Sequence, residues 1–207
     1  MNLRSATIVT AILTSVVSLA LIAGNLIEAA AGMMGFIPAR LSGLLDLPGA
    51  SPALLTPFSA TLVHGGFFHL FFNMFMLLVC GIAVERVLGT GAVIALYLVS
   101  AVVAALAQWM LDPAGVAPVI GASGAVSGVL GAYALSFGRP KRLSNSPGVN
   151  RAVHILWLAI AWTILQVAVG YAAGAQGLLL ATPAHVGGFL TGLLLQRPLL
   201  LWRYRKA

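Results

Sequence analysis

The chain has 207 residues, enough for one domain, and 60% of them are apolar while only 7% are charged. This composition excludes a soluble globular protein and predicts a polytopic membrane protein, which we treat as a single domain over 1–207. The formal net charge of +7 would suggest nucleic acid in a soluble protein, but here we expect the lipid bilayer and not nucleic acid as the partner.

The apolar residues are grouped into long runs. A spanning helix needs about 20 apolar residues, and the first run is too long for the core of a signal peptide. We therefore expect an all-α bundle of six transmembrane helices with a long first external loop. The expected spans are 6–27, 68–84, 91–111, 120–138, 152–173 and 183–201. The single cysteine, Cys80, excludes an intramolecular disulfide.

The positions of the cations predict the orientation. With a cytoplasmic N-terminus and six crossings, Arg40 alone lies outside, and the other ten of the eleven Lys and Arg residues lie inside. This distribution satisfies the positive-inside rule, so we expect both termini in the cytoplasm. The cytoplasmic cations are Arg4, Arg86, Arg139, Lys141, Arg142, Arg151, Arg197, Arg203, Arg205 and Lys206.

The first external connection, about 28–66, is rich in proline and glycine but also in apolar residues. We expect it to fold into short helical pieces that lie partly in the outer leaflet. The second span then carries His69 and Asn73, which are four residues apart and so share one helix face. This pair should point into the bundle, either as interhelical hydrogen-bonding groups or as part of a site. His64 lies nearer the surface, in an interfacial or supporting position.

The fourth span begins with Gly121-Ala-Ser-Gly124, which places the hydroxyl of Ser123 uncovered at the start of a helix. The N–H groups of the first helical turn can stabilise negative charge there, so Ser123 is a candidate nucleophile. Taken alone, the same string more often marks a small-residue packing surface. The functional interpretation therefore depends on how Ser123 aligns with other polar residues.

The last span supplies that alignment. His185 lies at its outer end and is followed by Gly188 and Gly192, which match the pair Gly124 and Gly128 of the fourth span. Two helices with such pairs can approach backbone to backbone, which would bring the imidazole of His185 to Ser123.

Depth in the membrane gives an independent check. Ser123 and His69 each lie 16 residues from the charged residue that ends their span, or ~24 Å at about 1.5 Å per residue. For His185 the same count gives ~18 or ~27 Å, depending on which arginine ends the span. All three would lie a few ångströms below the outer surface of a core about 30 Å thick, where water enters only from outside.

These residues predict nucleophilic catalysis. The neutral imidazole of His185 can take the proton of Ser123, and His69, Asn73 and the backbone N–H of Ser123 can stabilise an oxyanion. The acids all fall in loops or near helix ends, so we expect a Ser–His dyad without a carboxylate, cofactor or metal. The acids are Glu28, Asp46, Glu85 and Asp112.

The motifs together resemble those of the rhomboid intramembrane serine proteases. They are His69-x-x-x-Asn73, Glu85-x-x-x-Gly89, Gly121-Ala-Ser-Gly124 with Gly-Ala-Tyr133, and Ala184-His-x-x-Gly188-x-x-x-Gly192. The resemblance implies a six-helix core, Ser123 as nucleophile, His185 as base, and His69 with Asn73 as oxyanion donors. It also implies membrane-protein substrates cut near the outer face, with small residues at the cut, and we expect a bacterial plasma membrane.

The chain departs from the family pattern at two places. Many members carry an aromatic residue that stacks on the catalytic histidine four positions after the nucleophile, and this chain has Ser127 there. His185 must then be held in another way, by hydroxyl contact or by glycine packing. The Trp-Arg pair that some members carry in the first external loop is also absent, which bears on substrate entry rather than on the chemistry.

Three other functions compete with proteolysis. A small transporter or channel would need ionisable groups along a path through the core, whereas here the acids avoid it. A metal site could be built from His64, His69 and His185, but the first two do not share a helix face. A catalytically silent relative would bind transmembrane segments without cutting them.

Overall fold

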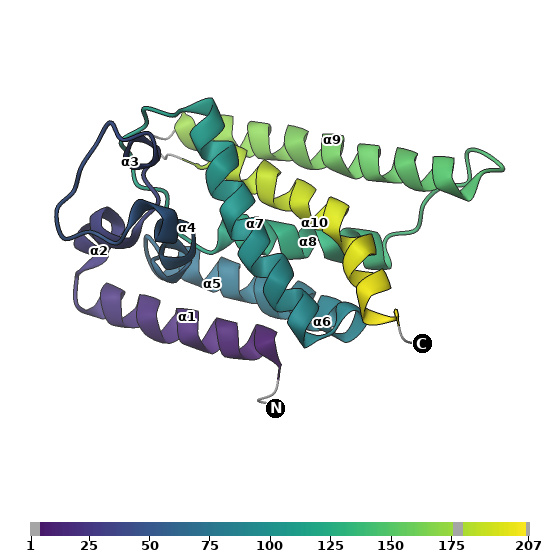
Figure 1. The fold of residues 1–207 in the computed structure, drawn as a ribbon, viewed down its shortest axis with the longest axis horizontal. Helices are drawn as coiled ribbons and strands as arrows, with labels where there is room; N and C mark the ends of the chain where they lie inside the picture. Colours follow the sequence, from purple (N-terminus) through teal and green to yellow (C-terminus); the bar gives the residue numbers. More distant parts are fainter. Residues whose placement is uncertain (1–4, 176–179, 206–207) are drawn as a thin grey trace.

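The computed structural model describes residues 5–175 and 180–205, and this part of the chain folds into helices without a strand. Figure 1 shows the elements in chain order, with the first loop at one end of the bundle. The helices are α1 Ala6–Ala23, α2 Ile27–Met34, α3 Pro38–Leu41, α4 Thr56–Ser59, α5 Phe67–Met76, α6 Ile82–Leu88, α7 Thr90–Leu111, α8 Ser123–Phe137, α9 Pro147–Gly174 and α10 Thr182–Arg203, with the short turns η1 Ala53–Leu55, η2 Ala60–Leu62 and η3 Leu77–Gly81.

Each of the six predicted spans corresponds to helix, which confirms the predicted fold class. The first span ends four residues early, at Ala23, because Asn25 adopts a left-handed φ of 54° that a helix cannot continue through. The second is one continuous segment in which the π-helical turn η3 joins α5 to α6. Such a turn widens the helix locally and commonly lies near functional residues.

Four of the helices in the described residues are long and apolar enough to cross a membrane: α1, the α5–α6 segment, α7 and α9. The predicted fourth span, α8, has only 15 residues, or ~22 Å of helix. Because the hydrocarbon core is about 30 Å thick, a helix of this length cannot reach both surfaces. One end of α8 must therefore lie inside the apolar layer.

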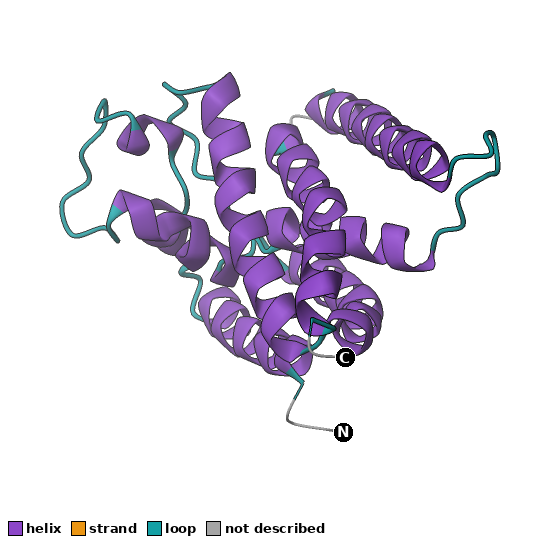
Figure 2. Ribbon diagram, turned by 45° about the vertical axis from the view of Figure 1, so that its right-hand side comes forward, coloured by secondary structure: helices purple, strands orange, loops and turns teal. Residues whose placement is uncertain are grey.

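The centre of the bundle is α8, which packs against α7 and α10. Figure 2 shows these helices crossing at the middle of the molecule, with α9 set apart at the edge. Most of the α8 residues between Gly124 and Ala132 are buried, whereas none of the residues of α9 is. Small side chains make this arrangement possible, because glycine and alanine allow helix axes to approach closely in lipid.

Arginines join several of the helix ends that are expected to face the cytoplasm. Arg203 at the end of α10 donates to the carbonyl of Arg86 in α6, at 2.6 Å. Arg151 in the first turns of α9 donates to Gln196 of α10, which in turn donates to Ser136 of α8. The predicted cytoplasmic cations Arg4 and Lys206 lie outside the described residues.

The first loop contains the expected short helical pieces, α2 to α4 with η1 and η2. Phe36 and Val119 exchange two backbone hydrogen bonds, of 2.9 and 2.8 Å, and so tie this loop to the segment before α8. The N–H of Gly121 donates to the carbonyl of Ala60, at 2.9 Å. The loop therefore holds the chain in place immediately ahead of Ser123.

Glu85 fastens the start of α1 to the core. Its carboxylate accepts hydrogen bonds from the hydroxyls of Ser5, Thr7 and Thr90, and from the backbone N–H groups of Ala6 and Thr7, over 2.6–3.0 Å. A carboxylate at a helix N-terminus satisfies N–H groups that have no partner within the helix. The sequence pattern placed Glu85 at a helix end, and the structure adds that this end is joined to two other helices.

Replacing Glu85 by Ala should lower the stability of the bundle strongly, because several buried donors lose their shared acceptor. We expect a loss of about 3 kcal/mol, which corresponds to ~6–12 °C in the unfolding midpoint. Thermal unfolding in detergent measures this shift. Glu28→Ala is the matched control, since Glu28 is exposed at the start of α2. Equal unfolding midpoints for the two variants would show that the carboxylate of Glu85 does not stabilise the bundle.

Candidate active site

Ser123 is the first residue of α8, so the N–H groups around it have no acceptor within the helix. The turn before it depends on Gly121, whose φ of +108° is unfavourable for other residues. A Cβ at Gly121 would also lie 2.7 Å from Nε2 of His69. Both constraints require glycine at this position, and together they leave the serine hydroxyl at the mouth of the helix.

His185 lies in the first turn of α10, opposite Ser123. Its Nε2 is 2.8 Å from Oγ of Ser123. The two residues are 62 positions apart in the sequence, so only the packing of α8 on α10 brings them together. A hydroxyl and an imidazole at hydrogen-bond distance can pass a proton from oxygen to nitrogen.

The packing of α8 on α10 occurs at the glycines of both helices. A Cβ added at Gly188 would overlap the carbonyl oxygen of Gly124, and one added at Gly192 would overlap that of Gly128. The two backbones are thus in direct contact over about one helical turn on each side. Any larger residue at these positions would separate the helices and increase the distance between Ser123 and His185.

His69 lies beside the same turn, and a hydrogen bond to its ring favours one of the two neutral tautomers. The N–H of Gly65 donates to Nδ1 of His69, at 3.3 Å. In a neutral ring the proton then lies on Nε2, which faces Gly121 and can donate to an atom bound at Ser123. Asn73 is turned differently, since its side-chain amide donates to the carbonyl of His69, at 2.9 Å. One of its two amide hydrogens is therefore already used.

His64 is more deeply placed than its sequence position suggested. Its side chain is only 1% exposed. Nε2 accepts a hydrogen bond from the N–H of Ala122, and Nδ1 donates to Ser18 of α1, whose hydroxyl donates to the carbonyl of Leu62. Burial, with a smaller effect of His69, lowers the pKa of His64 to about 3. His64 therefore supports the turn before Ser123, and both of its ring nitrogens already have protein partners.

Sequence reasoning missed two residues of α9 that contact His185. Oε1 of Gln166 is 2.9 Å from Nδ1 of the His185 ring, and the indole of Trp162 donates to the His185 carbonyl at 3.3 Å. In the described residues, the hydrogen bonds to the imidazole come from Gln166 and Ser123, and not from the hydroxyl of Ser127. A glutamine within a spanning helix was the available signal, because such amides face the protein interior.

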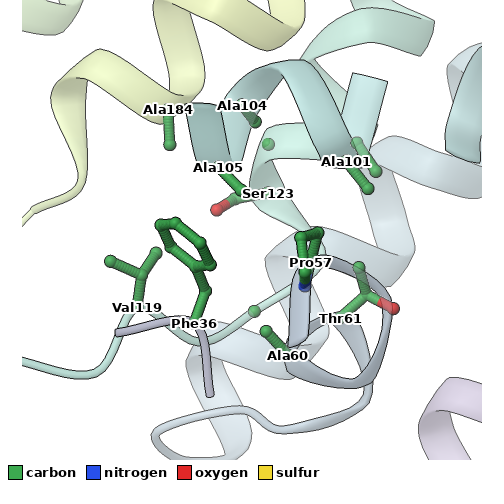
Figure 3. Close-up of a pocket in the computed structure, with 13 residues that line it drawn as sticks. Phe36, Pro57, Ala60, Thr61, Ala101, Ala104, Ala105, Val119, Ser123 and Ala184 are labelled. Atoms are coloured by element: carbon green, nitrogen blue, oxygen red, sulfur yellow. The ribbon is translucent and has the colours of Figure 1, made fainter. Parts of the chain in front are cut away.

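A small cavity of about 30 Å³ adjoins Ser123. Figure 3 shows its walls, with the rings of Phe36 and Pro57 beside Ala60 on one side and the alanines of α7 and α10 on the other. Three of the alanines come from α7, with others from η2, α8 and α10, and Val119 closes the cavity next to its hydrogen bonds with Phe36. A cavity of this volume accommodates a small apolar group next to the hydroxyl.

Comparison with known proteins shows which family of sequences this chain resembles. A sequence model of the Rhomboid domain matches residues 51–202. Rhomboid protease GlpG from Pectobacterium atrosepticum is 32% identical over 139 residues, which are 67% of this chain and 46% of that protein. Rhomboid protease GluP from Bacillus subtilis is 31% identical over 140 residues, 67% of this chain and 24% of its own length. RHOMBOID-like protein 5 from Arabidopsis thaliana is 32% identical over 139 residues, 67% and 42% of the two chains. The matched part is thus less than half of each relative.

Replacing Gly188 by Ala tests the contact that aligns the two residues. The added methyl group must displace the backbone of α8, and such overpacking costs about 1–3 kcal/mol. We expect a lower unfolding midpoint in detergent. Gly32→Ala in α2 is the control, because a Cβ there has no neighbour within 4 Å. An unchanged midpoint for Gly188→Ala would mean that the two helices have room to separate without cost.

Proposed function

Because this chain belongs to the rhomboid family, whose members include intramembrane proteases, we propose that it is an intramembrane serine endopeptidase. The observation that carries this proposal is the 2.8 Å distance between Oγ of Ser123 and Nε2 of His185. The apolar helices and the family make the chain an integral membrane protein. The reaction proposed is hydrolysis of a peptide bond in or near the outer end of a transmembrane substrate.

In the first step Oγ of Ser123 attacks the carbonyl carbon of the substrate while Nε2 of His185 takes the hydroxyl proton. The protonated imidazole then gives this proton to the leaving amine as the peptide bond breaks, which leaves an acyl-enzyme. Water, whose proton is taken by the same nitrogen, then attacks the ester. The acid product leaves, and the hydroxyl of Ser123 is regenerated. The sequence of steps needs one base and one nucleophile, and no cofactor.

The negative oxygen of the tetrahedral intermediate needs donors placed in advance. Two support the proposal: the N–H of Ser123 at the start of α8, and Nε2–H of His69 beside Gly121. The amide of Asn73 is a weaker contributor here, because it already donates to the carbonyl of His69. Donors in a site with little water should act more strongly than the same groups in bulk solvent.

The substrate class follows from the site's surroundings. The cavity of about 30 Å³ beside Ser123 fits a small side chain at the cut, and its lining includes alanines of the helices α7, α8 and α10. We therefore propose transmembrane segments of membrane proteins as substrates, with small residues at the cleavage point. With both termini in the cytoplasm, as the cations predict, the site opens to the external side.

Labelling with a fluorophosphonate probe tests the nucleophile and its base. We expect the probe to label the protein in detergent, and Ser123→Ala or His185→Ala to abolish labelling, because the first removes the attacking oxygen and the second its proton acceptor. Ser127→Ala is the matched control, since Ser127 lies one turn further along α8 and should not affect labelling. A chelator should also have no effect.

Persistent labelling of the His185→Ala protein would remove His185 from the mechanism. Failure of the unmodified protein to react, while the Rhomboid fold is intact by thermal unfolding, would favour a catalytically silent protein that only binds transmembrane segments.

The two side chains proposed as oxyanion donors, His69 and Asn73, should differ in importance. We expect His69→Ala to lower kcat for cleavage of a transmembrane substrate by about 10²–10³-fold, the usual loss for one oxyanion donor. Asn73→Ala should lower it by less, because its amide is partly used within α5. Rates are measured in proteoliposomes with each protein at the same reconstituted amount. A larger loss for Asn73→Ala than for His69→Ala would reverse the assignment.

A further inference from the structure

The imidazole of His185 is bonded on both sides, by residues of two different helices. Nε2 faces Ser123 of α8 at 2.8 Å, and Nδ1 faces Oε1 of Gln166 of α9 at 2.9 Å. The ring therefore lies between α8 and α9 with each nitrogen at hydrogen-bond distance from a partner. The contact with Ser123 is the one that transfers a proton in the proposed reaction. The contact with Gln166 takes no direct part in that reaction.

The contact with Gln166 determines which nitrogen of the ring carries the proton. For Nε2 to accept the proton of Ser123 it must be unprotonated, and a neutral ring then carries its one proton on Nδ1. Nδ1–H needs an acceptor, and the amide oxygen of Gln166 is in place to be one. If the amide nitrogen faced Nδ1 instead, it would favour the other tautomer, in which Nε2 is protonated and cannot serve as a base.

Gln166, the partner of Nδ1, is a neutral side chain, as expected for a residue within a spanning helix. A carboxylate here would be a charge inside the apolar layer, where an ion without several hydrogen bonds is costly. The buried carboxylate of Glu85 does not serve as this partner. It accepts its hydrogen bonds at the start of α1, near the end of the α5–α6 segment. An amide orients the ring and selects its tautomer, but adds little to the stability of the protonated imidazole.

Gln166 is itself held at the level of His185 by contacts of two neighbouring residues, Trp162 and Thr182. One turn earlier on α9, Trp162 donates to the His185 carbonyl and stacks on Phe189, with ring centroids 4.6 Å apart. The hydroxyl of Thr182 at the start of α10 donates to the carbonyl of Gln166, at 3.4 Å. Since α9 buries none of its residues, these contacts are what seat this part of the helix against α10.

We propose that Gln166 is a positioning residue that holds His185 in the tautomer and orientation needed for proton transfer. The proposal rests on the proposed function for its catalytic consequence, but the state of the ring is a separate property that can be measured without turnover. It also accounts for Ser127, where many relatives carry an aromatic residue: the histidine is steadied from α9 rather than by stacking from α8.

The kinetic experiment compares Gln166→Leu with Gln166→Glu in proteoliposomes. Leucine has no acceptor, so we expect kcat to fall about tenfold, the worth of one hydrogen bond between neutral groups, while KM stays within about twofold. Glutamate keeps an oxygen acceptor for Nδ1, and the apolar surroundings favour its neutral acid, whose carbonyl oxygen replaces that of the amide, so it should restore kcat. Ile164→Ala is the control on the same helix, because Ile164 is exposed and should leave both constants unchanged.

The spectroscopic experiment uses ¹⁵N-histidine protein in the Ser123→Ala background, where the hydroxyl cannot influence the ring. We expect Nδ1 of His185 to be protonated and Nε2 bare, and the addition of Gln166→Leu to give a mixture of the two tautomers. The His185 signals are assigned by their loss in a His185→Gln protein. Because this readout needs no activity, it decides the role of Gln166 even if the protein proves not to cleave substrates.

Two results would overturn the proposal. One is an unchanged kcat and unchanged tautomer in Gln166→Leu. The other is a loss in Gln166→Glu as large as that in Gln166→Leu, with both proteins folded by thermal unfolding. If the leucine protein does not fold, Gln166→Asn takes its place, because it keeps the amide but draws its oxygen back from Nδ1, and the same tautomer and kcat shifts are expected.

Discussion

The contact between the glycines of α8 and α10 is the constraint on which the rest of the site depends. In lipid, no hydrophobic force drives helices together, so two backbones stay in contact only where their surfaces fit closely. Gly124 and Gly128 meet Gly188 and Gly192 in this way, and the first turns of the two helices then carry Ser123 and His185 to 2.8 Å from each other. The short distance between Ser123 and His185 is thus a consequence of having glycine, and no larger side chain, at these four positions.

Polar groups hold the surrounding elements onto this pair of helices. α1 is fastened near its start by Glu85 and near its end by Ser18, which accepts from His64. His64 in turn accepts from the N–H of Ala122, the residue before Ser123. Because lipid offers no hydrogen bonds to replace these, each of the contacts is costly to open. A chain of bonded polar groups therefore runs from the first helix to the turn that presents the serine.

The sequence was sufficient to predict the helical spans, the face shared by His69 and Asn73, and the glycine pairs, because each follows from a local period or a spacing on one helix. It did not predict the partners of Glu85 or Gln166, since both make contacts with residues distant in the sequence, and a polar residue in an apolar helix indicates only that it faces inward. The early end of α1 was missed because Asn25 can occupy either a helical or a left-handed conformation. The roles of Ser123, His185, His69 and Asn73 remain predictions.

The contact of α9 with His185 links the candidate site to the thickness of the bilayer. This helix has 28 residues, ~42 Å at about 1.5 Å per residue, which is more than the hydrocarbon core, and it buries none of them. A long helix of this kind can adjust its tilt to the thickness of the membrane, and in this protein the same helix contacts the imidazole of His185 through Gln166. Acyl-chain length would then act on the alignment of His185, so that the composition of the membrane becomes a modulator of the site.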